Sequence, residues 1–81
     1  MSPKRFKEIR LELDLTQDEA ALILGVRDKT TISRYENGSR RPSVLMSATW
    51  EILVELPRKD SQRLIELLKK RVAKLKKDFV E

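Results

Sequence analysis

The 81-residue sequence contains no cysteine and no histidine. Without thiols the chain forms no disulfide bonds, and without thiolates or imidazoles it lacks the usual ligands of zinc sites. The same absences exclude Cys-His and Ser-His-Asp nucleophile systems, and no glycine-rich phosphate loop is present. We therefore expect no metal, no cofactor and no enzymatic activity, and a core too small for a substrate cavity.

Glycine and proline are scarce, with two and three residues. β-branched residues nowhere alternate with polar residues over the length of a strand, so the sequence predicts helices alone. No apolar run approaches the ~20 residues that span a membrane, and no secretion signal follows the first residues. We expect an all-α protein that is soluble and stays in the cytoplasm.

The chain is about half as long as a typical domain of ~150 residues, which predicts one domain with at most an appended element. A core of this size supplies roughly 3 to 5 kcal/mol, and a partner chain is the remaining means of adding to it. The net charge is +5, and residues 58–81 alone carry nine basic and four acidic side chains. The basic excess therefore lies mainly at the C-terminal end.

Capping residues and glycines predict about five helices. Ser2 precedes a proline suited to the first helical position, and Thr16 and Glu19 have the spacing of a capping box. Gly25 suits the end of the second helix, and Asp28 suits the start of the third. The expected helices span residues 3–13, 16–24, 29–37 and 44–56, followed by a long amphipathic helix that begins at Asp60 or Ser61 and ends near Val80.

The stretch from Leu15 to Pro42 resembles the helix-turn-helix family of Cro and the phage repressors, also called XRE-like. Ala21 lies where the two motif helices would cross, since a larger side chain would separate them. Gly25 makes the turn, and Val26 and Ile32 fill the angle between the helices.

The resemblance implies a compact, lambda-repressor-like helix-turn-helix bundle that binds double-stranded DNA. Residues 1–57 would form this DNA-binding domain, and residues 58–81 would form an amphipathic helix used for dimerisation. In the family, the second motif helix enters the major groove and its N-terminal residues read the bases. The base-reading positions implied here are Lys29, Thr30, Ser33 and Arg34. The positions implied for the phosphate backbone, which orient the protein without reading sequence, are Gln17, Arg27, Asn37, Arg40 and Arg41.

Two departures from the family pattern affect these assignments. Five residues separate Val26 from Ile32 where the family usually has four, so Arg27 is interpreted as an insertion. The base-reading residues then lie either at the positions named above or one position away. Leu22 stands where the family usually has a polar residue, while Ala20 stands where leucine is usual. We interpret this shift as a sign that Leu22 meets another surface.

The last helix carries an apolar stripe with spacings of three and four, typical of a helix that packs on a partner. The stripe packs either on its own domain or on a second subunit. We favour a homodimer, because two-fold symmetry places two reading helices about 34 Å apart on one side of the duplex. The residues assigned to the dimer contact are Trp50, Ile65, Leu68, Val72, Leu75 and Phe79. The basic residues between 69 and 77 are interpreted as a solvated face, with phosphate contact as the alternative.

Taken together, these features predict a bacterial or phage transcriptional regulator that acts on the nucleoid as a repressor or autoregulator. The alternative is an antitoxin or adaptor whose main partner is another protein, such as a toxin, and whose DNA binding serves autoregulation. A membrane-surface role is least favoured, because the apolar stripe is narrow and holds one aromatic residue.

Overall fold

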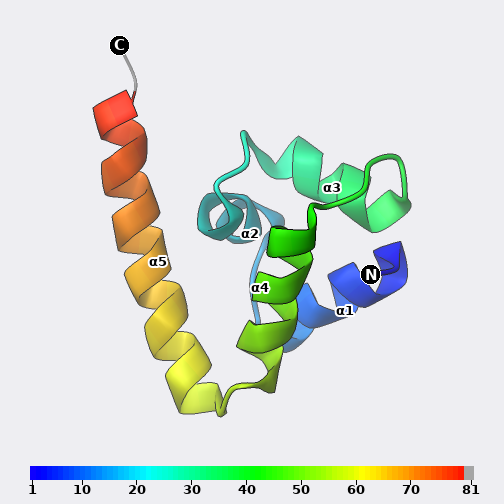
Figure 1. Ribbon diagram of the computed structural model, residues 1–81, viewed down its shortest axis with the longest axis horizontal. Coiled ribbons are helices and arrows are strands. Elements are labelled where there is room, and N and C mark those ends of the chain that lie inside the picture. Colours follow the sequence, from blue (N-terminus) through cyan, green and yellow to red (C-terminus); the bar gives the residue numbers. More distant parts are fainter. Residues whose placement is uncertain (80–81) are drawn as a thin grey trace.

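The structure is a computed structural model that describes the backbone of residues 1–79 and the side chains of residues 1–77. This part of the chain is all-α, as the sequence predicts, with five helices and no strand. The helices are α1 (Pro3–Glu12), α2 (Gln17–Leu24), α3 (Lys29–Asn37), α4 (Val44–Glu55) and α5 (Arg58–Phe79). Helices α1 to α4 form a compact group, and α5 runs along one side of it (Figure 1). None of these helices is long and apolar enough to cross a membrane.

Each of the first four helices begins after a residue whose side chain caps its first turn. At Thr16 the capping box is complete: its hydroxyl accepts from the Glu19 amide at 3.1 Å, and its own amide donates to the Glu19 carboxylate at 2.9 Å. Ser2, Asp28 and Ser43 each accept from a backbone amide in the first turn of the helix that follows. Local hydrogen bonding thus fixes where α1 to α4 start.

The start of α5 differs from the prediction. The helix begins at Arg58, immediately after Pro57, whereas a start at Asp60 or Ser61 was expected. The carbonyl of Pro57 accepts from the amides of both Asp60 and Ser61 at 2.9 Å, which closes the first turn around the proline. Asp60 therefore lies inside the first turn, where a negative charge is favourable. The predicted end at Val80 lies outside the described residues.

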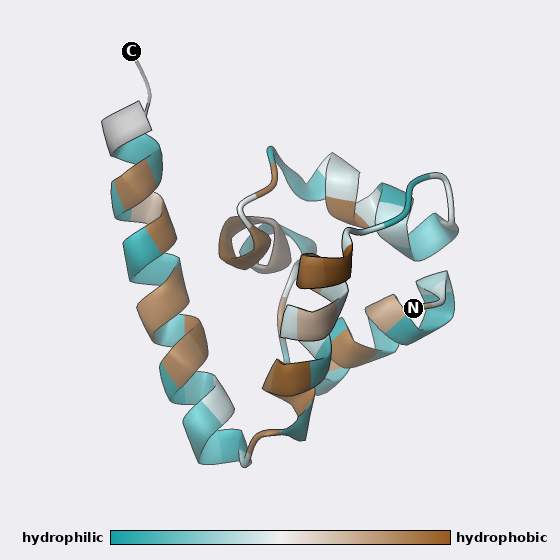
Figure 2. Ribbon diagram, in the orientation of Figure 1, coloured by the Kyte–Doolittle hydropathy of each residue, from teal (hydrophilic) through white to brown (hydrophobic). Residues whose placement is uncertain are grey.

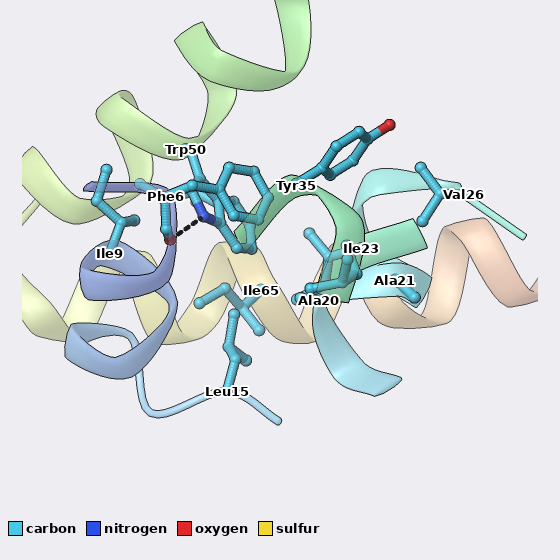
Figure 3. Close-up of a cluster of buried hydrophobic side chains, with 12 residues drawn as sticks. Phe6, Ile9, Leu15, Ala20, Ala21, Ile23, Val26, Tyr35, Trp50 and Ile65 are labelled. Atoms are coloured by element: carbon cyan, nitrogen blue, oxygen red, sulfur yellow. Dashed lines mark hydrogen bonds between the residues drawn. The ribbon is translucent and has the colours of Figure 1, made fainter. Parts of the chain in front are cut away.

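Three aromatic side chains hold α1, α3 and α4 together in the core (Figure 3). Phe6 stacks on Trp50 with ring centres 5.4 Å apart, and it meets Tyr35 edge-on at the same distance. The indole N–H of Trp50 donates to the carbonyl of Phe6 at 3.1 Å. Trp50 is wholly buried in its own subunit, so the prediction that it contacts a second subunit is wrong.

Helix α5 packs against α2, and its apolar stripe is divided between the core and the surface. Ile65 is buried in the core and Leu68 is half-buried against it, so packing on the same domain, the alternative weighed from the sequence, accounts for this end of the stripe. Ile65 is therefore not available for the dimer contact that was predicted for it. Val72 is half-buried and Leu75 is 46% exposed, while the side chain of Phe79 lies outside the described residues. Figure 2 shows apolar and polar segments alternating along the length of α5.

Polar contacts also fix α5 to the motif helices. The ammonium group of Lys69 donates to Glu19 of α2 at 2.7 Å, and that of Lys76 donates to the carbonyl of Val26 at 3.3 Å. The hydrogen bond from Lys69, followed by that from the Thr16 amide, lowers the pKa of the Glu19 carboxyl below its ordinary 4.5. The same bond from Lys69 to Glu19 raises the pKa of Lys69 above 10.5.

The turn after α2 depends on the backbone conformation of Gly25. This residue has φ +68°, in the left-handed region, and its amide bonds the carbonyl of Leu22. A Cβ added at Gly25 would meet no atom within 4 Å. Glycine is therefore favoured here by its backbone conformation and not by a lack of space for a side chain. Ala21, in contrast, is buried where α2 lies against its neighbours, and its small size matters for packing.

Substituting Gly25 by alanine should therefore destabilise the fold by about 1 kcal/mol, through left-handed backbone strain alone. Gly25→Asn should cost less, because asparagine tolerates this conformation better. Urea unfolding of the two variants and the wild type measures the differences in the free energy of unfolding. Equal stability of all three would show that the turn does not depend on the glycine conformation.

Acid should weaken the attachment of α5 to α2. Because the folded-state pKa of Glu19 is lowered, its contribution is complete above about pH 4.5 and is lost as the pH falls through the folded-state value. Both side chains are partly exposed, so we expect Glu19→Gln to cost less than about 1 kcal/mol at neutral pH. Urea unfolding as a function of pH should show the variant and the wild type converging below about pH 4.5. Glu51→Gln, which changes an exposed carboxylate on α4, is the control; convergence in that variant as well would contradict a specific role for Glu19.

Candidate nucleic-acid interface

Helix α3 has one buried face and one exposed face. Ile32 and Tyr35 point into the core and are buried. On the outer side Lys29, Thr30 and Arg34 are exposed. Ser33 is half-buried beside them, so the four positions predicted to read bases share one side of the helix. Their side chains carry ammonium, hydroxyl and guanidinium groups, which pair with base edges in a major groove.

The first turn of α3 is fixed by Asp28. Its carboxylate accepts from the amide of Thr30 at 3.0 Å, and Lys29 is the first helical residue. Arg27, interpreted from the sequence as an insertion, forms an exposed bend before this cap. Residues from Lys29 to Asn37 have regular helical spacing.

A buried ion pair fixes α3 to α1. The guanidinium of Arg10 donates from Nε to Glu36 Oε2 at 2.5 Å and from Nη2 to Oε1 at 3.3 Å. A third bond runs from Nη1 to the carbonyl of Leu15, in the connection before α2, at 2.8 Å. The side chains of Arg10 and Glu36 are only 10% and 6% exposed. The sequence does not predict this pair, although Arg10 falls on the same side of α1 as Phe6 and Ile9.

Gln17 joins the same network. Its side-chain amide donates to Glu36 Oε1 at 3.0 Å, and the residue is half-buried at the first position of α2. The second hydrogen of this amide and the outward-pointing backbone amides of a helix N-terminus are suited to an anion. Gln17 thus lies at the junction between the buried network and the surface.

The remaining positions assigned to the DNA backbone lie after the end of α3. The side-chain Oδ1 of Asn37 accepts from the backbone amide of Ser39 at 2.8 Å, and the amide of Arg40 donates to the backbone carbonyl of Arg34 at 3.2 Å. This loop folds back over the last turn of α3 and leaves Arg40 and Arg41 exposed beside it. Arg27 is exposed at the opposite end of the helix. Basic side chains therefore flank α3 at both ends.

The sequence model of the helix-turn-helix family matches residues 6–48, more than half of the chain. The chain belongs to the helix-turn-helix family. No curated protein and no solved structure gives a significant match. In this helix-turn-helix protein α2 and α3 are the motif helices, and membership makes it a DNA-binding regulator in general terms, of a family that is typically non-enzymatic. Helix α5 lies outside the matched residues.

Removing one partner of the buried Arg10–Glu36 pair should strongly destabilise the fold. Arg10→Met leaves the Glu36 carboxylate buried without its partner, and we expect a loss of about 3 to 5 kcal/mol. The double variant Arg10→Met/Glu36→Leu should recover much of that loss, because neither charge remains. Urea unfolding of both variants measures these differences.

Arg5→Met is the matched control, since Arg5 on the same helix pairs with Glu8 and Glu12 at the surface. It should cost less than about 1 kcal/mol. If Arg10→Met is no more damaging than Arg5→Met, the buried pair does not determine how α3 is held.

Proposed function

We propose that this protein is a sequence-specific transcriptional regulator that binds an operator in double-stranded DNA, with the outer face of α3 in the major groove. The observation that carries the proposal is the exposed row of Lys29, Thr30 and Arg34 on a helix whose opposite face is buried. A helix held from one side in this way presents its polar groups to a ligand without rearrangement. Regulation then consists of occupying the operator, as a repressor or autoregulator, and needs no catalytic step.

In this proposal the side chains divide into two groups. Arg34 and Lys29 pair with guanine edges, while Thr30 and Ser33 contact neighbouring bases. Phosphate contacts orient the helix in the groove without reading sequence. The residues proposed for those contacts are Gln17, Arg27, Asn37, Arg40 and Arg41.

We further propose that the protein acts as a homodimer in the cytoplasm, with residues 1–57 as the DNA-binding domain and residues 58–81 as the dimerisation element. Support comes from apolar side chains that α5 leaves at the surface: Leu64, Leu67 and Leu75 are 37%, 56% and 46% exposed. Pairing of this surface, with Val72 at its edge, would cover them and set the spacing of two copies of α3. A palindromic operator with half-sites about 34 Å apart is then expected.

A second candidate function is supported by α4. Val44 and Leu45 are 88% and 76% exposed, and Ile52 is exposed on the same helix. Such an apolar surface, with the acidic Glu51 and Glu55 and no basic residue on α4, suits a protein partner. In that case the protein is an antitoxin or adaptor that also regulates its own gene. Co-purification with the product of the neighbouring gene, lost in Leu45→Glu, distinguishes this candidate from a regulator without a protein partner.

Removing base-reading groups should reduce discrimination between DNA sequences. Each of Arg34→Ala and Thr30→Ala should lower the preference for the operator over random duplex by about 1 to 3 kcal/mol, roughly five- to 150-fold. Arg41→Ala should weaken binding to both duplexes about equally, since a phosphate contact is the same on any sequence. Fluorescence anisotropy at fixed salt, with the region upstream of the gene as the operator source, measures both affinities. Unchanged discrimination in the α3 variants would reject the proposal.

A further inference from the structure

We propose that the C-terminal half of α5 is a second DNA-binding surface, in which Lys70, Lys74 and Lys77 contact the phosphate backbone beside the groove that α3 occupies. We call these three residues the lysine row. The inference rests on the proposed function, because it places the row on the same duplex.

The first argument is position. The ammonium group of Lys76 is 3.3 Å from the carbonyl of Val26, which lies two residues before the Asp28 cap of α3. The end of α5 thus reaches the turn that precedes the proposed reading helix. In Figure 1 the last turns of α5 lie at the same end of the molecule as α3, across α2 from it, whereas the first turns lie at the far end.

The second argument is the rotation of α5 about its axis, which two contacts fix. Lys69 bonds Glu19 of α2 and Lys76 bonds Val26, so both residues face the motif helices. At about 100° per residue, the lysine row falls together on one side of that contact face. Leu64, Leu68 and Leu75 fall on the other side, whereas Leu67 lies next to Lys74. The row is exposed, and pairing through Leu64 and Leu75 leaves it accessible to DNA.

The third argument is charge. Residues 69–77 contain six basic side chains and no acidic one, whereas the first half of α5 mixes both signs. Lys70, Lys74 and Lys77 are spaced by four and three residues, and like charges at these spacings destabilise a helix. A face that serves solubility alone gains nothing from this arrangement. A polyanion beside the helix relieves the repulsion.

The dimensions of the row also fit a duplex. Seven residues of helix separate its ends, which is about 10 Å at ~1.5 Å per residue. One DNA strand carries a phosphate about every 3.4 Å along the axis, so the row spans roughly three phosphates. The row therefore has the reach to follow one strand at the edge of the groove.

The experiment compares two variants that each lose three positive charges from α5. One is Lys70→Gln/Lys74→Gln/Lys77→Gln, and the matched control is Arg58→Gln/Lys59→Gln/Arg63→Gln at the other end of the helix. Binding of a fluorescein-labelled random duplex of roughly 20 base pairs, two helical turns, is measured by anisotropy between about 50 and 200 mM KCl. Circular dichroism checks that both variants keep the helical content and melting temperature of the wild type.

Because each phosphate contact contributes about 0.9 to the slope of log K against log salt concentration, the lysine-row variant should lower that slope by two to three. Its affinity at the lowest salt should fall at least about tenfold, while the control keeps a slope close to that of the wild type. Equal effects of the two variants, or a wild-type slope in the lysine-row variant, would overturn the inference. In either case the proposed function stands if Arg34→Ala still loses discrimination; a wild type that does not bind duplex DNA at all rejects both.

A proximity measurement supplies an independent check, since the chain has no native cysteine. Iron-EDTA attached to Lys74→Cys should cleave the bound duplex, and the same group on Arg63→Cys should leave it intact. Equal cleavage from both positions, or none from position 74, contradicts contact between the lysine row and DNA.

Discussion

The ion pair between Arg10 and Glu36 is the interaction on which the position of α3 depends. It joins α1 to α3 directly, and through the carbonyl of Leu15 and the amide of Gln17 it also includes the start of α2. Removing two charges from water costs several kcal/mol each, and that cost is offset only when the hydrogen bonds are all made. In this structure α1, the connection before α2 and α3 satisfy them together. We therefore expect the pair to contribute more to the orientation of α3 than to the net stability of the fold.

Apolar packing also holds α3 in place. Phe6 contacts both Trp50 and Tyr35, so one side chain of α1 fixes the positions of α4 and α3 relative to each other. Ile32, one turn before Glu36, is wholly buried on the same side of α3. With its inner side held by charge and by aromatic packing, α3 has one side left for a ligand. The exposed row of Lys29, Thr30 and Arg34 is thus a consequence of how the opposite side is fixed.

Features that depend on neighbours in the sequence were predictable, and features that depend on distant residues were not. The caps at Thr16 and Asp28 and the turn at Gly25 follow from local hydrogen bonds and backbone conformation, which a sequence displays directly. The Arg10–Glu36 pair joins residues 26 positions apart, and its one local signal is a charge on the apolar side of α1. Trp50 was misassigned because a helix that is apolar on nearly every side does not indicate which side faces inward. The stripe of α5 has the same periodicity whether it packs on its own domain or on a second copy, so Ile65 was misassigned for the same reason.

In the proposal made above, α5 links these observations to DNA binding, although it lies outside the part of the chain that defines the family. Its contact with Val26 lies on the backbone just before the cap of α3, and its contact with Glu19 lies on the capping box of α2. Both contacts come from lysines on the side that packs against the motif, and the lysine row lies on the adjacent side of the same rigid helix. Phosphates bound to the row would hold α5 against α2, so contact with the backbone and the placement of α3 in the groove reinforce each other.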